Sequence, residues 1–506
     1  MTAENLVIFC RSVYLSLQYV MLGAAVFILC ALALVAGYFL YGRLVEKVYG
    51  PDKNFVMPCI SSPDGVDYVP LPTWKIFLIQ LLNIAGLGPV VGAVSGCLFG
   101  PSVLFWIVLG CIFAGAVHDF TAAFMSADLR GRNLPDVMGL VMGRSARVFM
   151  SIMCVFLLLM VGVVFTLLPA GMLHGLMPDA ASLTLWGAAI LVYYFLATML
   201  PIQSIIGRIY PVFGALFLFM AVGLVVGMCF SNHEFLPNLE IWRNHHPQNL
   251  GIWPMVFVTI ACGAISGFHA TQSPMMVRCL RDVQHMRRVF YGAMVVEGLV
   301  ALVWAVVGLS LRECLFNVNG EELSFAALTL KTPSLAINEA CRLLMGDVCA
   351  FVAVLGVVVL AITSGDTAMR SCRLMLADLL NIPQKSVVSR LALAIPLFAV
   401  VFGISQVDFS VIWRYFGWAN QTLACLTLWC VSLYLRNRRR CYWISLLPAL
   451  LMTVVCTCYF LYSPDCGMCI DIMYATLAGI ALAVIFLLLF LYRGAAKPSV
   501  RGELTE

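Results

Sequence analysis

The chain has 506 residues, of which 62% are hydrophobic and 11% are charged, and its mean hydropathy is +0.98. Soluble domains average about half apolar and about a quarter charged residues, so the composition excludes a soluble globular protein. It indicates an integral membrane protein. The length accommodates about a dozen helices of about 20 residues joined by short loops. We therefore expect one all-α, polytopic membrane protein in contact with the lipid bilayer.

Thirteen apolar runs of spanning length follow one another along the chain. Each predicts a helix, because only helices and closed barrels satisfy the backbone polar groups in lipid. The first run is too long for the core of a signal peptide and has no small-residue cleavage site after it, so we expect it to be retained. The least marked division lies near Val407. The approximate bounds are 15–40, 74–98, 101–125, 148–169, 183–203, 209–230, 252–277, 289–311, 348–369, 391–406, 409–434, 442–462 and 471–492.

Charge then orients the runs. When they are threaded alternately through a bilayer, about 24 of the 30 Lys and Arg residues fall on one side, which the positive-inside rule assigns to the cytoplasm. The loops on the other side, such as 231–250 and 313–331, are acidic or neutral. This threading places the N-terminus outside and the C-terminus in the cytoplasm. The net charge of +5 therefore reflects topology, and no nucleic-acid partner is expected.

Most of the 20 cysteines lie within apolar runs, where a thiol acts as a small hydrophobic group. Cys466 and Cys469 differ, because they form a C-x-x-C in a short polar connection. This pair has no second pair and no histidine nearby, which disfavours zinc and redox chemistry; whether the two thiols pair stays open. We expect no cofactor.

The second run contains "LLNIAGLGPVVG" (81–92), which is typical of a broken helix. Gly86 and Gly88 each disfavour helix by about 1 kcal/mol relative to alanine, and Pro89 removes a backbone donor. The helix is expected to open between Ala85 and Gly88, and a new helix is expected to begin at the proline. Free amides at such a break attract anions and free carbonyls attract cations. A simple kink with small-residue packing is the alternative.

A second break is expected five spans later, in "TIACGAISGFHATQSP" (Thr259–Pro274). Gly263, Ser266, Gly267 and His269 lie here in the middle of an apolar run. Two interrupted helices at matching positions of two five-helix halves indicate an inverted repeat with a midplane binding site. The prediction is a 5+5 transporter core at 74–435, preceded by an extra helix and loop at 1–73 and followed by two helices and a tail at 436–506.

Polar residues also interrupt the apolar run "VVVLAITSGDTAMRS". Thr363, Ser364, Asp366 and Thr367 bring three hydroxyls and a carboxylate, which are hard oxygen ligands suited to sodium. Asp366 could carry a proton instead, or form a structural ion pair with Arg370 four residues on. No metal other than sodium is expected.

Further ionisable residues within predicted spans are His118 and Asp119 in "FAGAVHDF" and Glu297 in "MVVEGLV". These three are candidates for a proton relay, and polar contacts between helices are the alternative. His269 is a further candidate for a titrating group. An intramembrane hydrolase using His118 and Asp119 would need a serine or cysteine elbow, which does not accompany them in sequence, so an enzyme is not expected. Arg414 could attract an anion or extend its charge toward the membrane surface.

Six segments, in this order, resemble the signature segments of the carbon starvation protein A (CstA) family: "NIAGLGPVVG", "GAVHDF", "GRIYPVFGA", "ACGAISGFHATQSP", "ITSGDTAMRSCRLMLAD" and "WRYFGWANQTLA". The resemblance runs from about residue 73 to about residue 435. It departs where many members carry paired histidines, because this chain has Ile79 and Gln80 there. The chain is also shorter than the long members and resembles the compact branch.

The resemblance implies a carrier of the bacterial inner membrane with leucine-transporter-like architecture, related to the amino acid, polyamine and organocation transporters. It also implies peptide and pyruvate uptake as a stress response when carbon is scarce. The candidate substrate site comprises Asn83, Ala85, Gly86, Leu87, Gly88, Gly263, Ser266, Gly267 and His269. The candidate cation site comprises Ala85, Gly88, Thr363, Ser364, Asp366 and Thr367.

Together these patterns predict a cation-coupled symporter that works by alternating access and imports a small carboxylate, such as pyruvate, or short peptides. The coupling ion would be sodium or a proton. The alternative class is an ion channel or a membrane-embedded sensor of carbon status without transport. The absence of a cytoplasmic signalling domain weighs against the sensor. The sequence leaves the oligomeric state open.

Overall fold

A computed structural model describes residues 22–50, 55–63, 68–199, 202–231, 233–236, 240, 242–318, 320–384, 386–464 and 467–493. Within these ranges the chain is almost entirely helical and has one two-stranded antiparallel hairpin. The all-α, polytopic fold is thus confirmed. Cys466 lies outside the described residues, and with it the question of its pairing with Cys469.

The elements follow the apolar runs in chain order. The first half contains α2 (Tyr41–Tyr49), α3 (Pro58–Ser61), α4 (Thr73–Ile84), η1 (Gly88–Gly92), α5 (Ala93–Gly96), η2 (Cys97–Phe99), α6 (Ser102–Gly110), η3 (Cys111–Gly115), α7 (Ala116–Asp128), α8 (Leu134–Met142), α9 (Arg144–Leu176), α10 (Leu183–Met199) and α11 (Ile202–Phe230). The second half contains α12 (Ile252–Thr259), α13 (Gly267–Val277), η4 (Val283–His285), η5 (Arg287–Tyr291), α14 (Gly292–Leu311), β1 (Leu315–Val318), β2 (Glu321–Ser324), α15 (Phe325–Lys331), α16 (Pro333–Leu380), α17 (Val387–Ile404), α18 (Phe409–Asn437), α19 (Trp443–Tyr462) and α20 (Ile472–Arg493).

Nine helices of the described ranges are long and apolar enough to cross a membrane, and a bent pair, Thr73–Ile84 with Gly88–Phe99, brings the number to ten. Three more of the expected runs correspond to α10, which has 17 residues, to the broken pair α12 and α13, and to the more polar α18. The expected division near Val407 lies between the end of α17 and the start of α18. The number thirteen, the inverted repeat and the three-part division of the chain stay predictions.

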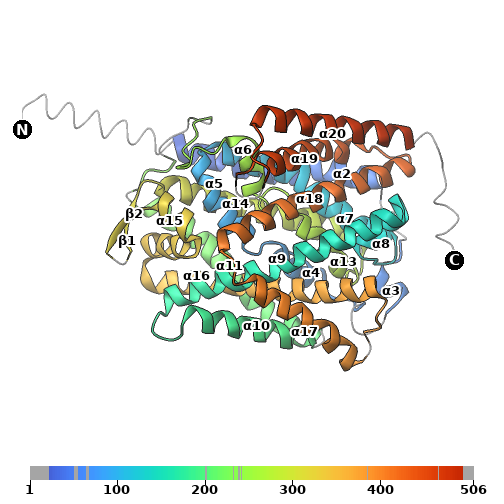
Figure 1. Cartoon of the computed structure of the whole chain (residues 1–506), viewed down its shortest axis with the longest axis horizontal. Helices are drawn as coiled ribbons and strands as arrows, with labels where there is room; N and C mark the ends of the chain where they lie inside the picture. Colours follow the sequence, from blue (N-terminus) through green and yellow to red (C-terminus); the bar gives the residue numbers. More distant parts are fainter. Residues whose placement is uncertain are drawn as a thin grey trace, which may run out of the picture.

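The helices run along the long axis of the molecule, with α9 and α16 in the middle, α20 along one side and α10 and α17 along the other (Figure 1). The hairpin of β1 and β2 lies at one end, and α3 and α8 lie toward the opposite end. The helix α19 is joined to α18, because Trp429 Nε1 donates to Thr453 Oγ1 at 2.9 Å and the hydroxyls of Ser432 and Ser445 lie 2.9 Å apart.

Both predicted breaks are present. In the first broken span, the helix ends at Ile84 and begins again at Gly88, with a bend of 51° between the two parts. The second leaves Ile260–Ser266 without helix between α12 and α13. In each case the break lies in a glycine-rich stretch, because glycine disfavours the helical conformation.

The polar stretch at 363–367 does not break its helix. The helix α16 runs from Pro333 to Leu380, and its kink lies at Gly346, where φ is +73°. The hydroxyls are satisfied within the helix: Thr363 Oγ1 donates to the Leu360 carbonyl at 2.8 Å and Thr367 Oγ1 to the Ser364 carbonyl at 3.0 Å. Such bonds let threonine sit inside a helix.

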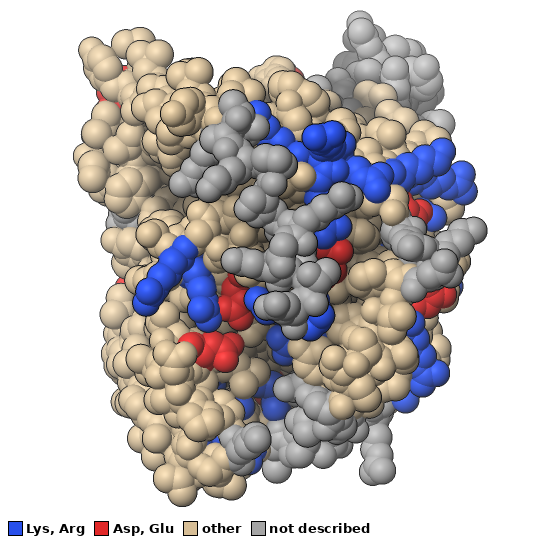
Figure 2. All heavy atoms as spheres, turned by 90° about the vertical axis from the view of Figure 1, so that its right-hand side faces the viewer, with Lys and Arg blue, Asp and Glu red and all other residues tan. Residues whose placement is uncertain are grey.

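The end of the molecule beyond α8 is strongly basic. Figure 2 shows Lys and Arg side chains spread across this end, with fewer Asp and Glu side chains among them. Loops from several spans are tied together here. Arg278 donates to the Gly131 carbonyl and to Asn133 Oδ1, both at 2.8 Å, and Asn133 Nδ2 donates to Asp378 at 3.1 Å. We call Asn133, Arg278 and Asp378 the basic-end clamp.

We expect Gly267→Ala to lower the melting temperature of the purified protein. A methyl group at Gly267 would lie 2.4 Å from the Asn420 carbonyl oxygen and 2.6 Å from the Ala424 nitrogen, which are backbone atoms of α18. Overpacking of this kind costs about 1–3 kcal/mol. The matched control is Gly187→Ala in α10, where a methyl group meets nothing within 4 Å. Thermal unfolding in detergent measures both, and equal melting temperatures would contradict the close packing of α13 on α18.

Candidate functional site

The two broken helices cross in direct contact. A methyl group on Gly88 would lie 2.2 Å from both Cβ and Sγ of Cys262, and one on Gly92 would lie 2.8 Å from the Thr259 carbonyl oxygen. The glycines of the first broken helix are therefore required for close approach to the second. As a result the unwound segments lie side by side, covered by protein, as free backbone inside a membrane must be.

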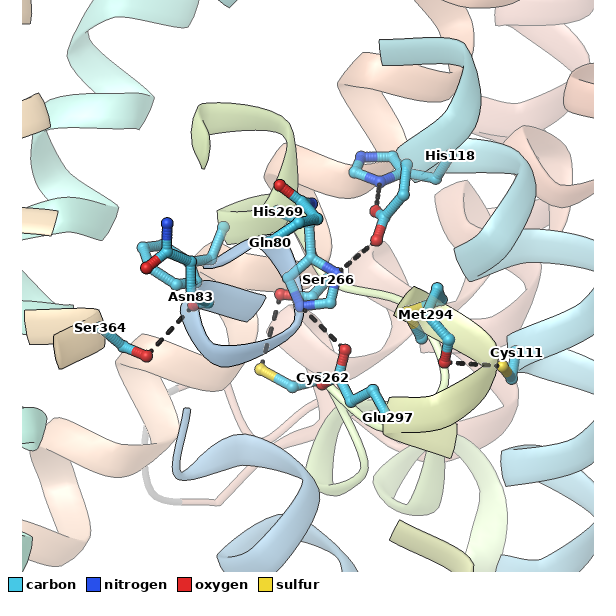
Figure 3. A network of polar contacts seen from close by, with 12 residues as sticks. Gln80, Asn83, Cys111, His118, Cys262, Ser266, His269, Met294, Glu297 and Ser364 are labelled. Carbon is cyan, nitrogen blue, oxygen red and sulfur yellow. Dashed lines mark hydrogen bonds and ion pairs between the residues drawn. The ribbon is translucent and has the colours of Figure 1, made fainter. Parts of the chain in front are cut away.

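Ser364 on α16 joins the first break. Its hydroxyl lies 3.0 Å from the carbonyl oxygen of Leu82 and 3.1 Å from that of Asn83 (Figure 3). These carbonyls belong to the last turn of α4, where a helix leaves its carbonyls without helical partners. Two other residues of the expected cation site lie nearby: Gly88 lies against Cys262, and Ala85 donates its N–H to the Leu81 carbonyl at 2.8 Å.

Asp366 is buried in α16, and among the described residues its Oδ1 has no hydrogen-bond partner. The Arg370 guanidinium, four residues on, donates to the Ala197 carbonyl on α10 at 2.5 Å. The ion pair between Asp366 and Arg370 stays a prediction. Asp366 thus stays a buried carboxyl group next to Thr363, Ser364 and Thr367.

Asn420 on α18 organises the second break, and the sequence analysis did not single it out. Its Oδ1 accepts from the Phe268 N–H at 2.8 Å and from the Ser266 hydroxyl at 3.1 Å. One free amide at the start of α13 is therefore already satisfied by a side chain, which leaves fewer donors for an anion than the break alone suggests. The pair Asn420 and Gln421 within an apolar run was the available signal.

Four ionisable side chains from three helices form one buried chain. On α7, His118 Nδ1 lies 2.9 Å from Asp119 Oδ1. Asp119 Oδ2 lies 2.8 Å from Nδ1 of His269 on α13, and His269 Nε2 lies 3.5 Å from Oε2 of Glu297 on α14 (Figure 3). We call these residues the His–Asp–His–Glu chain. The structure thereby brings together all three candidates for a proton relay and His269.

The predicted substrate residues are buried, and the structure places them at the two breaks. Asn83 Oδ1 accepts from the Tyr210 hydroxyl at 3.2 Å, while its Nδ2 has no partner in the part of the chain that is described. Gly86 lies against the Phe165 ring, and Gly263 lies against Ala301. Leu87 is also fully buried. The remaining residues, Ser266, Gly267 and His269, lie at the start of α13.

A cavity of about 200 Å³, which we call the outer cavity, is lined by residues of both breaks and by Lys331 of α15, which lies near the hairpin end of the molecule. Its lining includes Gly88 in the first break and Thr259 and Ala261 in the second. Lys331 and Arg414 also line it. Gly88 is the one predicted substrate residue in this lining. Burial, with the Arg414 charge, lowers the pKa of the lining residue His246 to about 4, so that its imidazole is neutral at pH 7.

Comparison with solved structures identifies the class of fold. A crystal structure of a mutant of the manganese transporter from Eremococcus coleocola matches 85% of this chain and 98% of its own, with a TM-score of 0.52 and 12% sequence identity. At this identity the likeness concerns the fold alone. The class is that of polytopic, helical membrane proteins.

The chain belongs to the family described as "Carbon starvation protein CstA", whose model matches residues 22–186, 179–346 and 334–459. An uncharacterized membrane protein from Haemophilus influenzae is 40% identical over 57% of this chain and 91% of its own length. A protein from Campylobacter jejuni named "Peptide transporter CstA" is 27% identical over 87% of this chain and 80% of its own length. The resemblance seen in the six segments is confirmed, and the chain is a membrane transporter.

We expect Asn420→Ala to destabilise the protein, because it leaves the Phe268 N–H and the Ser266 hydroxyl without their acceptor. A buried polar group left unsatisfied costs about 1–3 kcal/mol. The control is Thr427→Ala on the same helix, whose hydroxyl donates only to the Leu423 carbonyl of its own helix, at 2.8 Å. Thermal unfolding in detergent and the initial rate of uptake are the measurements. A melting temperature no lower than that of the control would contradict the role of Asn420.

Proposed function

We propose that this protein is a secondary active transporter, a cation-coupled symporter that imports a small carboxylate or a short peptide across the bacterial cytoplasmic membrane. The observation that carries the proposal is the contact of two broken helices at Gly88 and Cys262, at the inner end of the outer cavity and beside Ser364. Unwound backbone at such a position is the usual place of the substrate and ion sites of secondary transporters.

The outer cavity reaches the breaks from one side, which supports alternating access. The outer cavity reaches Gly88 and Ala261, while the clamp of Asn133, Arg278 and Asp378 ties three segments together at the basic end. To open toward the basic end, the transporter would have to break the hydrogen bonds of the clamp and close the outer cavity. The positive-inside rule makes the basic end cytoplasmic, so the cavity would face outside.

The orientation of the terminal spans fits this assignment. Near the end of the first described span, Glu46 lies 2.7 Å from Nε of Arg287. At the end of the last span, the carbonyls of Phe490 and Leu491 accept from Arg436. Both spans therefore run toward basic loops. We propose an external N-terminus and a cytoplasmic C-terminus on this ground.

A carboxylate is the feature that pyruvate and a peptide share. Lys331 and Arg414 in the cavity lining would attract such an anion, since clefts lined by one sign of charge raise the local concentration of counter-ions. Asp408 also lines the cavity, so that the lining is of mixed charge. The relatives named peptide transporters support peptides as one substrate class. Asn83, whose Nδ2 has no partner among the described residues, is our choice for a group that contacts the substrate.

Ser364 belongs to the proposed cation site. Its hydroxyl oxygen and the carbonyl oxygens of Leu82 and Asn83 are three hard ligands from two segments. Thr363 and Asp366, a residue or two away on α16, would complete an oxygen-rich pocket suited to sodium. A cation bound here would hold α4 against α16 and thereby bias one conformation, which is how an ion drives transport.

The decisive experiment is uptake of labelled pyruvate and of a labelled dipeptide into proteoliposomes, with sodium and proton gradients imposed separately. We expect accumulation against a concentration gradient under one of the two ions. Ser364→Ala should reduce ion-driven accumulation about tenfold, a typical size for coupling between two sites. The control is Ser151→Ala, whose hydroxyl bonds, among the described residues, only to the Arg147 carbonyl of its own helix, at 2.9 Å.

The alternative functions predict a different result. A channel would equilibrate its permeant without accumulation, and a membrane-embedded sensor would bind the substrate without moving it. Binding without accumulation under either gradient would therefore refute the symporter and favour one of these two.

A further inference from the structure

The His–Asp–His–Glu chain lies apart from Ser364, on the other side of the second break. Its members come from α7, α13 and α14, and all four side chains are 0% exposed. His269 is the central member and belongs to the first turn of α13, two residues after Gly267. The chain therefore connects the second half of a broken helix to two helices beside it.

The geometry limits where protons can sit. An ionised Asp119 at 2.9 and 2.8 Å from two imidazole Nδ1 atoms accepts an N–H from each of them. His269 then turns Nε2, 3.5 Å away, toward the Glu297 carboxyl group. This second nitrogen is a lone-pair acceptor when His269 is neutral and a donor when it is protonated. One proton can thus lie on Glu297 or on His269 Nε2.

This proton lowers the net negative charge of the buried chain. Without it, Asp119 and Glu297 are both ionised and both histidines are neutral, so that the buried chain carries a charge of about −2, which desolvation strongly disfavours. With it, the charge falls to about −1, and the remaining charge lies between two N–H donors. In the described part of the chain, neither Glu297 oxygen has a hydrogen-bond partner.

The groups around the pair add no positive charge. The titratable groups that face Glu297 and His269 are Asp119 and His118 on α7, Cys111 in η3 and Cys262 in the second break. Within the described ranges, no Lys or Arg forms an ion pair with any member of the chain. A proton is therefore the cation that can neutralise this site in its buried state.

The second break borders both the outer cavity and this site. Ala261 lines the outer cavity, and the next residue, Cys262, faces Glu297. On the other side His118 Nε2 is buried without a partner in the part that the structure describes. The His269–Glu297 pair thus lies close to the inner end of the cavity, behind the backbone of the second break.

We propose that His269 and Glu297 form the site of the coupling proton, and that movement of α13 gates its release. This rests on the proposed symport and names its driving ion. A proton from the outer cavity binds the Glu297 carboxylate, giving an O–H that donates to His269 Nε2. When α13 moves during opening to the cytoplasm, His269 separates from Glu297 and Asp119, water enters, and the proton leaves Glu297 to that water.

The test uses the full-length protein in proteoliposomes. A pH-sensitive dye reports proton movement on addition of substrate, and labelled substrate reports both accumulation under an imposed proton gradient and exchange at equilibrium. We expect Glu297→Gln to lose proton-driven accumulation about tenfold or more and to lose substrate-induced proton movement. Exchange at equilibrium should persist, because the glutamine keeps the shape of the side chain. Glu297→Asp should restore part of the proton movement.

The control is Glu46→Gln, which removes a carboxylate that pairs with Arg287 outside the predicted ten-helix core, and it should leave proton-driven accumulation unchanged. Three outcomes would overturn the proposal: undiminished proton-driven accumulation by Glu297→Gln, loss of equilibrium exchange together with accumulation in both Glu297 variants, or wild-type accumulation driven by sodium without proton movement. The last leaves the symporter intact. Failure of the wild type to accumulate substrate under any gradient would instead refute the proposed function itself.

Discussion

The structure depends on one constraint: backbone N–H and C=O groups deep in an apolar solvent must find partners within the protein. Two spans of this chain violate the simplest solution, an unbroken helix, and the rest of the fold supplies the compensation. The Asn420 amide takes up the Phe268 N–H, and the Ser364 hydroxyl meets the carbonyls at the end of α4. The two partners come from α18 and α16. The breaks are therefore held by the long helices around them.

The same constraint accounts for the glycines. Two unwound segments can lie side by side only if no side chain separates them, and Gly88 and Gly92 leave room for the backbone and side chain of the second break. Small residues allow such contact at little cost in a membrane, where helices gain no hydrophobic free energy by associating. The glycine-rich signature thus encodes a contact between two distant segments as well as a local bend.

Local chemistry allowed the sequence to predict both breaks, since glycine and proline act on the backbone where they stand. It also marked His118, Asp119, His269 and Glu297 as costly residues in an apolar run. It could not show that the four form one chain, because the contact between Asp119 and His269 spans 150 positions and depends on how α7, α13 and α14 pack. The role of Asn420 was missed for the same reason. At 363–367 the sequence marked a polar stretch, but it could not show that the hydroxyls of Thr363 and Thr367 bond to the backbone of their own helix.

The length of α16 has a mechanical consequence. This helix carries Ser364 near the first break and Asp378 in the clamp at the basic end, and it is helical between them. The 14 residues from 364 to 378 span about 21 Å at 1.5 Å per residue. A rigid rod of that length that pivots by about 5° at Ser364 moves its far end by about 2 Å, enough to break a hydrogen bond of ordinary length. Binding of a cation near Ser364 and the strength of the clamp are therefore coupled through α16.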